Sequence, residues 1–419
     1  MVALLVVGFA ALLVGALSFS AMNSARQERT TAALAQAKDA LIGKSITYDD
    51  YPGSLPCPDT DNDGVSDAGG ASECPIYIGR LPWKTLGLPE LRDGAGEQLW
   101  YTLSRNFRRY VSVLPLNSNT QGTLNITGTE TASNVIAIVF SPGSALSGQN
   151  RSAAQTASCI TTGTTVAYSL CATNYLEGSN KNLSSAATPN TNYQSAFAGN
   201  TFNDQLLFIT THDLMPLVEQ RVAGVVKQAL NDYYIASDTN PSNRYYPWAD
   251  SIGTTISYAS DIGLNRGWLP KNADTSGTNP TLDWDAGSLP AWFIPNEWYT
   301  LIYYSVAKDK TVKSSLCTTC VSTKLTVVNN NVTPSNTDNQ VQVLFFMPGT
   351  PIGTRWYDKL DDYLEDSANN QHDAVPNASP PPPSVSASAT PPDDNYIIPT
   401  SQNKDRDRIY YFSGTTWKP

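Results

Sequence analysis

The sequence opens with the stretch that decides its fold: Met1-Val-Ala-Leu-Leu-Val-Val-Gly-Phe-Ala-Ala-Leu-Leu-Val-Gly-Ala-Leu-Ser-Phe-Ser-Ala-Met22. This stretch contains no charged residue, and the first charge in the chain is Arg26. In a helix, about 22 residues span roughly 33 Å, which is the thickness of a bilayer's hydrocarbon core. A secretory signal peptide would carry a basic start and a small-residue cleavage site, and neither is present. The stretch therefore predicts an apolar helix of membrane length.

The helical pattern continues beyond the apolar stretch. Ala33, Leu34, Ala37 and Leu41 recur at spacings of three and four, which places them in one apolar stripe along a helix. Gly43 is the expected stop, because glycine is favoured just after the last turn of a helix. We expect one helix of about 42 residues, apolar in its first half and amphipathic in its second.

A continuous N-terminal helix of this kind resembles that of the type IV pilin and type II secretion pseudopilin superfamily. In that family a prepilin peptidase removes a short basic leader and the new N-terminus is methylated, which implies that Met1 is the processed residue. The family usually has Glu at the fifth mature position, where this chain has Leu5, a departure typical of minor, tip-located members. The resemblance implies that these residues pack in a filament core: Leu4, Leu5, Val6, Phe9, Leu12, Leu13 and Leu17.

Composition indicates a secreted or cell-surface protein. The 419 residues are 41% hydrophobic, only 15% charged and carry a net charge of −10. The length allows two globular domains. A nucleic-acid partner is excluded, because binding phosphates requires clustered Lys and Arg, and the sequence has no such cluster.

The six cysteines occur as neighbours along the sequence. We expect sequential disulfides, because each pair then closes a short loop: Cys57–Cys74, Cys159–Cys171 and Cys317–Cys320. An even number of cysteines among polar loops indicates an oxidising compartment. The alternative for the last pair is a redox or zinc motif, although neither a βαβ context nor a second Cys/His pair accompanies it.

An aspartate-rich loop lies between the first two cysteines. Residues 58–67 read Pro-Asp-Thr-Asp-Asn-Asp-Gly-Val-Ser-Asp, and this alternation of carboxylates resembles the start of an EF-hand loop. The expected calcium ligands are Asp59, Asp61, Asp63, the Val65 carbonyl and Asp67. Gly70 occupies the position of the usual twelfth-position Glu, and Glu73 is the substitute ligand. The alternative is a solvated acidic turn that binds no metal.

Features of the first half of the sequence recur in the same order in the second half. Trp298-Tyr-Thr-Leu301 repeats Trp100-Tyr-Thr-Leu103, and residues 341–349 match residues 135–143. Leu214 to Tyr234 predicts a second amphipathic helix, with Asp213 as its cap.

The recurrence predicts the fold class and the domains. We expect an α+β fold in which a long N-terminal helix carries a pilin-like antiparallel-sheet head, duplicated as two tandem modules. Residues 1–25 form the apolar half of the N-terminal helix, 26–210 the first module, and 211–419 a second module without a membrane segment.

The sequence predicts no catalytic site. His212 and His372 lie in no metal or nucleophile motif, and phosphate-binding and zinc-protease motifs are absent. We expect a structural subunit of a type IV pilus-like extracellular filament that polymerises through its N-terminal helix. The alternatives are a minor tip subunit acting as an adhesin or substrate-binding module, and a single-span anchored binding protein that does not polymerise.

The resemblance also implies partners and a location. The partners are other copies or other pilins, the inner membrane before assembly, the prepilin peptidase and the pilus assembly machinery. The location is the bacterial cell surface.

Overall fold

A computed structural model of the chain describes two compact units. One unit comprises residues 1–114 and 120–214, and the other comprises residues 115–119 and 215–419. Side chains are described from residue 20 onward. The residues that the structure describes are 2–49, 51–67, 73–108, 115–155, 171–185, 188–250, 265–270, 289–310, 324–329, 331, 335–349, 351, 364, 395–398 and 407–419.

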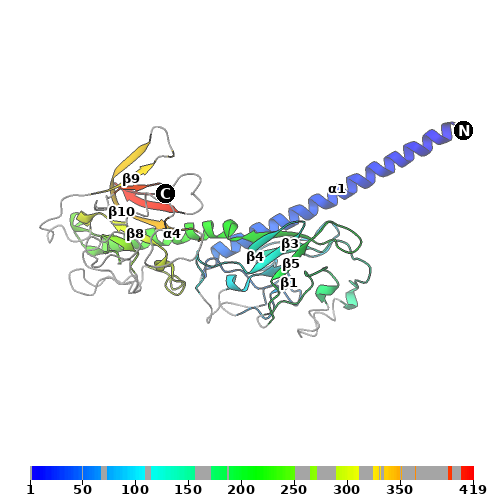
Figure 1. The fold of residues 1–419 in the computed structure, drawn as a ribbon, viewed down its shortest axis with the longest axis horizontal. Coiled ribbons are helices and arrows are strands. Elements are labelled where there is room, and N and C mark those ends of the chain that lie inside the picture. The colour runs from blue at the N-terminus through cyan, green and yellow to red at the C-terminus, as the bar shows by residue number, and fades with distance from the viewer. Residues whose placement is uncertain are drawn as a thin grey trace. The chain divides into compact units, whose positions relative to one another are not determined.

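The first unit begins with α1, Val2–Thr47, a single helix of 46 residues (Figure 1). It lies against β4 and β6 of the first sheet. The predicted stop at Gly43 is wrong, because the Thr47 hydroxyl donates to the carbonyls of Gly43 and Lys44 and so satisfies acceptors in the last turn. The predicted apolar stripe is buried, with no member more than 6% exposed: Ala33, Leu34, Ala37 and Leu41.

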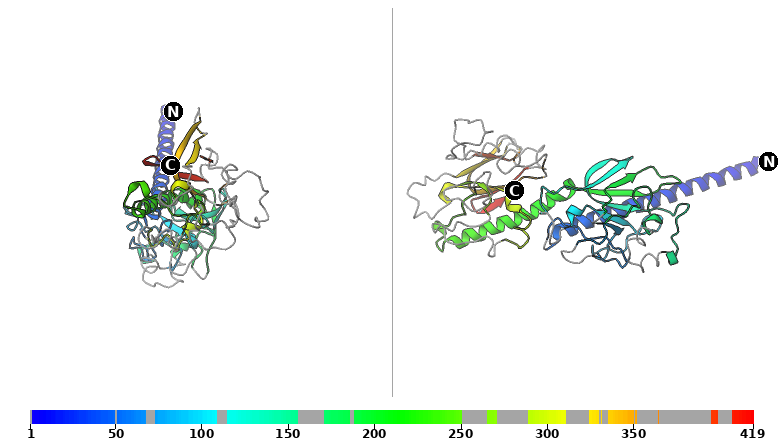
Figure 2. Two further views of the ribbon diagram at one scale, coloured as in Figure 1. Left: turned by 90° about the vertical axis from the view of Figure 1, so that its left-hand side faces the viewer. Right: turned by 60° about the horizontal axis from the view of Figure 1, so that its bottom comes forward.

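The burial of α1 changes abruptly at Thr30. From Thr30 onward one face of the helix is buried, whereas residues 20–29 are exposed on every face. The helix therefore leaves the core of the unit at Thr30 and continues as helix toward its N-terminus (Figure 2). Among the described residues, no helix combines the length and the apolar character needed to cross a membrane.

The first sheet is built around β4. β4 pairs antiparallel with β2, β3 and β6, β1 pairs antiparallel with β2, and β5 runs parallel to β3. Its core contains Trp100, Phe140 and Tyr193, which are no more than 1% exposed. The strands and the 3-10 helix η1 have these bounds: β1 Ile78–Arg80, β2 Trp100–Leu103, η1 Arg105–Phe107, β3 Leu124–Gly128, β4 Ala132–Ser141, β5 Asn192–Ser195 and β6 Gln205–Thr210.

The second sheet is built around β10. β10 pairs antiparallel with β8, β9 and β12, β7 pairs antiparallel with β8, β11 runs parallel to β9, and β12 continues into a hairpin with β13. The strands have these bounds: β7 Arg266–Trp268, β8 Tyr303–Val306, β9 Leu325–Asn329, β10 Asn336–Met347, β11 Asn395–Ile397, β12 Arg408–Ser413 and β13 Thr416–Lys418. Three short 3-10 helices accompany them: η2 Pro241–Asn243, η4 Trp298–Thr300 and η5 Lys308–Lys310.

The helix α4, Thr211–Ser237, follows β6 without an intervening loop. It extends the predicted helix by three residues at each end. Asp213 does not cap it as expected. Instead, its carboxylate accepts hydrogen bonds from the backbone N–H and hydroxyl of Thr210 and pairs with Lys38 of α1 at 3.0 Å. Leu217, predicted on the apolar face, is 41% exposed.

A short segment from the first half of the sequence, residues 115–119, belongs to the second unit. The Leu116 N–H donates to the side-chain oxygen of Asn296 at 3.1 Å, and the Asn117 amide donates to the Asn296 carbonyl at 2.8 Å. The Ser118 hydroxyl donates to Glu219, a fully buried residue of α4 that also pairs with Arg408.

The predicted fold class, a pilin-like antiparallel head duplicated as two tandem modules, is wrong. Both sheets are mixed, because each contains a parallel pair. The clearest sequence repeat also takes two different structures, since Trp100–Leu103 is strand β2 whereas Trp298–Thr300 is 3-10 helix η4. Tertiary context decides the difference: in the second sheet, the strand next to β10 begins only at Tyr303, beyond the repeated residues.

Candidate functional site

A disulfide closes the aspartate-rich loop in the first unit. Cys57 and Cys74 are bonded and no more than 1% exposed, which confirms the first predicted pair. Cys171 is buried and disulfide-bonded. The remaining cysteines lie outside the described residues: Cys159, Cys317 and Cys320.

The loop is fixed at its start by the neighbouring strand. The backbones of Asp59 and Arg80 form an antiparallel bridge with hydrogen bonds of 3.0 and 2.8 Å. The Asp59 carboxylate accepts hydrogen bonds from the N–H groups of Asn62, at 2.6 Å, and Gly64, at 2.7 Å. Gly64 has a φ of 84°, and a Cβ there would lie 2.7 Å from the Trp83 ring. Only glycine therefore suits this turn.

Three carboxylates converge in the loop. One oxygen from each of Asp59, Asp61 and Asp67 lies within 4.8 Å of the others. Asp59 is 1% exposed, and burial raises its pKa to about 7 despite the two backbone hydrogen bonds, with Asp67 and Asp61 adding repulsion. Burial also raises the pKa of Asp67. The donor chemistry suits a hard divalent cation, because carboxylate oxygens are the ligands such cations prefer and a cation would offset the mutual repulsion.

Two predicted ligands are placed differently. The Asp63 carboxylate accepts a hydrogen bond from the Val65 N–H at 2.6 Å, and the Asp63 carbonyl accepts one from the Lys84 ammonium. Neither Asp63 nor Val65 belongs to the three-carboxylate cluster. Glu73 pairs with Arg105 at 2.7 Å, and Gly70 lies outside the described residues.

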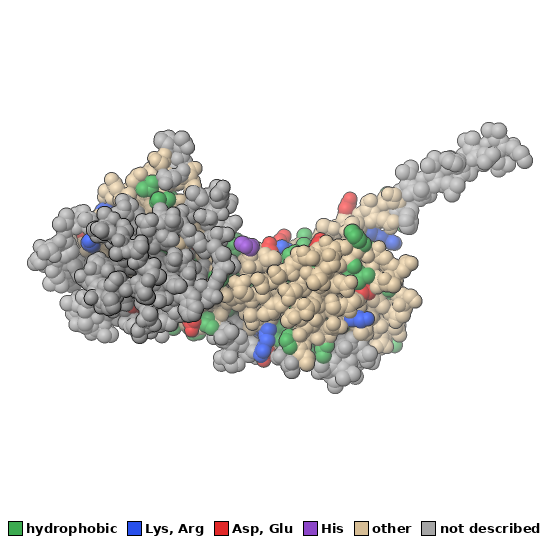
Figure 3. All heavy atoms as spheres, viewed as in Figure 1, with side chains coloured by type: hydrophobic (Ala, Val, Ile, Leu, Met, Phe, Trp, Pro, Cys, Tyr) green, Lys and Arg blue, Asp and Glu red, His purple; other side chains and the backbone are tan. Residues whose placement is uncertain are grey.

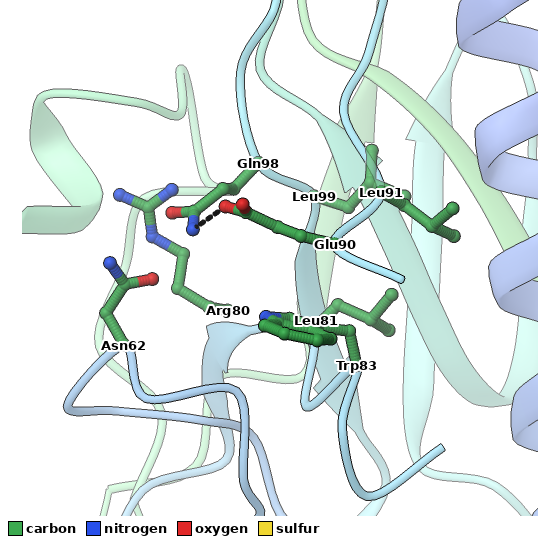
Figure 4. A pocket seen from close by; sticks show the side chains of 8 residues that line it. All are labelled: Asn62, Arg80, Leu81, Trp83, Glu90, Leu91, Gln98 and Leu99. Carbon is green, nitrogen blue, oxygen red and sulfur yellow. Dashed lines mark hydrogen bonds between the residues drawn. The ribbon is translucent and has the colours of Figure 1, made fainter. Parts of the chain in front are cut away.

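A pocket that was not predicted adjoins the loop. Asn62 of the loop and Arg80 of β1 line it together with Trp83, Glu90 and Gln98, whose side chains converge on one space (Figure 4). The sequence signal available for it was an arginine inside a buried strand, since charged residues are rarely buried without a reason.

Other predicted functional residues are not brought into this site. His212 is an exposed residue in the first turn of α4, and His372 lies outside the described residues. The side chains of Met1 and of the predicted filament-core residues, Leu4 to Leu17, lie outside them as well. On the face drawn in Figure 3, the described charged side chains are scattered rather than gathered into a patch.

Comparison with protein-family models, with curated proteins and with solved structures finds no match. The resemblance to pilins therefore rests on the sequence of the N-terminal helix alone.

Proposed function

We propose that the protein is a structural subunit of a type IV pilus-like extracellular filament that polymerises through the apolar part of α1. The observation that carries the proposal is the change along this one helix. Its amphipathic part is buried against the first sheet, whereas residues 20–29 are exposed on every face. The sequence that precedes this exposed stretch is free of charge through residue 22. Such a segment is stabilised by leaving water, and equivalent segments of other copies provide the apolar surface.

The described parts of the first unit agree with a location outside the cytoplasm. The Cys57–Cys74 disulfide is typical of an oxidising compartment. In this proposal the apolar segment lies in the inner membrane before assembly, and the prepilin peptidase and assembly machinery act on it there. The sheet units then form the outer surface of the filament.

Leu12→Lys tests the proposal. A lysine ammonium among packed apolar helices costs roughly 3 kcal/mol per copy, which should exclude the variant from filaments. The matched control is Ser24→Lys, which adds the same charge where α1 is exposed on every face. Sheared filaments would be examined by electron microscopy and mass spectrometry, and cell extracts by immunoblotting.

We expect Leu12→Lys to be present in cells but absent from the filaments, and Ser24→Lys to assemble. Equal incorporation of both variants would refute assembly through this segment. The amount of the wild-type chain separates the alternatives: a dominant component is a major subunit, a trace component is a tip subunit, and absence leaves a membrane-anchored binding protein.

We further propose that the aspartate loop binds calcium through Asp59, Asp61 and Asp67. The supporting observation is the burial of Asp59 within a cluster of carboxylates that repel one another. Calcium should raise the melting temperature of the wild type, and a chelator should lower it, because a ligand that binds only the folded state stabilises it. Asp61→Asn should weaken calcium binding more than Asp63→Asn, because only Asp61 belongs to the cluster. Identical melting curves with calcium and with chelator would show that the loop is a metal-free acidic turn.

A further inference from the structure

Arg80 is a buried arginine in β1 that is held by aromatic rings. It is 8% exposed, and its guanidinium lies 4.1 Å from the ring centroid of Tyr175 and 4.8 Å from that of Trp100. A guanidinium stacked on ring faces keeps its N–H donors pointing outward in the plane of the group. The stacking therefore fixes the orientation of the guanidinium without satisfying its donors.

Arg80 has no polar partner for these donors in the described part of the chain. Its backbone bridges to Asp59, but its side chain makes neither a hydrogen bond nor an ion pair there. Arg151, which stacks at 4.9 Å from the same Tyr175 ring, pairs with Glu97 and donates to the Asn174 and Gly143 carbonyls. Buried donors normally have acceptors, so Arg80 is the exception of the two.

The free donors of Arg80 face the pocket beside the aspartate loop. Figure 4 shows the guanidinium at one side of this space, with the amides of Asn62 and Gln98 next to it and the Trp83 ring on the apolar side. Gln98 donates to Glu90, and Glu90 pairs with Arg92 at 2.6 Å. The carboxylate of Glu90 is thereby held by Gln98 and Arg92.

We propose that this pocket binds the carboxylate group of a small organic acid, with the guanidinium of Arg80 as the bidentate donor. The planar fork of arginine matches the two oxygens of a carboxylate. The Asn62 and Gln98 amides offer further polar contacts, and Trp83 and three leucine side chains offer an apolar wall for the carbon attached to the carboxylate. The empty space is about 210 Å³, smaller than ordinary ligand pockets, so it suits a small acid or the acidic end of a larger one.

A singly charged acid is favoured over a phosphate or sulfate. Glu90 brings one negative charge to the same pocket, and its repulsion is greater for a dianion than for a carboxylate. The site thus distinguishes anions by charge as well as by shape.

The test is saturation-transfer NMR on the full chain with sodium acetate as the probe. Acetamide is the neutral isostere, and sulfate is the dianion. We expect saturable acetate binding, with acetamide and sulfate weaker by at least about tenfold. Glucuronate and N-acetylglycine then distinguish a sugar acid from a peptide-like acid as the source of the carboxylate. Binding of acetamide as tightly as acetate, or tighter binding of sulfate, would overturn the assignment.

Three variants locate the binding. Arg80→Met keeps the unbranched stem over the rings and should abolish acetate binding. Arg105→Met is the matched control, since that arginine already pairs with Glu73, and it should bind acetate as the wild type does. Glu90→Gln should tighten binding about two- to fivefold by removing a like charge. If Arg80→Met fails to fold, Glu90→Gln decides: unchanged or weaker acetate binding in that variant would overturn the proposal.

Discussion

Asp204→Asn is expected to remove a pH dependence from the stability of the first unit. Asp204 and Glu177 are 4% and 7% exposed, and each accepts a hydrogen bond from the other's backbone N–H, at 2.9 and 3.1 Å. Asn180 donates to Asp204, and Gln149 donates to Glu177. Burial, and then the charge of Glu177, raise the pKa of Asp204 well above its ordinary value. One proton is therefore retained by this carboxyl pair in the folded state.

The sign follows from comparing the folded and unfolded chains. In the unfolded chain the Asp204 carboxyl ionises with a pKa of about 4, whereas the folded pKa is higher. The stability associated with the retained proton is fully present below pH 4 and is lost as the pH rises toward the folded pKa. While only the folded state holds the proton, the free energy of unfolding falls by about 1.4 kcal/mol per pH unit, or up to about 2.7 kcal/mol between pH 5 and pH 7.

Asparagine reproduces the protonated state without titrating. Its carbonyl accepts the hydrogen bonds that Asp204 accepts, and its amide donates to Glu177 where the carboxyl proton would. The stability of Asp204→Asn relative to the wild type should therefore rise with pH.

The assay is urea unfolding at pH 5, 6 and 7, with hydrogen exchange in β4 and β6 reporting on the first unit. The control is Asp39→Asn, which removes an exposed carboxylate of α1 in the same unit and should not change the pH dependence. Parallel stability curves for Asp204→Asn and the wild type between pH 5 and pH 7 would refute the shared-proton reasoning.

Two further substitutions probe the packing of each unit. A Cβ on Gly94 would lie 2.2 Å from the Arg26 carbonyl of α1, so Gly94→Ala should lower the melting temperature of the first unit, at a cost of about 1–3 kcal/mol. Gly43→Ala, with nothing within 4 Å, should instead stabilise α1 by up to about 1 kcal/mol, and equal effects of the two changes would contradict the close approach. In the second unit, Glu219→Gln leaves the Arg408 charge without its buried partner and should cost about 3–5 kcal/mol in urea unfolding. Unchanged hydrogen exchange in β12 would argue against that cost.

The elements that the sequence predicted well are those in which local pattern and burial agree. The stripe from Ala33 to Leu41 follows the helical period, and the same residues are buried. The end of α1 was not predictable from Gly43, because it depends on the Thr47 hydroxyl reaching back to two carbonyls. The repeated Trp-Tyr-Thr-Leu failed as a guide for a related reason: pairing with a distant strand decides whether such a tetrapeptide is extended.

The candidate site was predictable only in part. Alternating spacing brings Asp59 and Asp61 together and the loop returns Asp67 to them, but Lys84 from outside the loop engages the Asp63 carbonyl. The pocket at Arg80 left no motif, because it depends on Tyr175, which lies 95 residues farther along the chain. Burial against rings from distant segments is a tertiary property that residue spacing does not carry.

The placement of residues 115–119 has a consequence for how the two units can be separated. No single cut in the polypeptide divides them, because the chain enters the second unit, returns to the first, and enters the second again. A fragment that starts at residue 215 would lack the donors for Asn296 and the Ser118 hydroxyl on Glu219. The second unit is therefore completed by a piece of chain made about a hundred residues earlier, and during synthesis that piece must wait for the segment it completes.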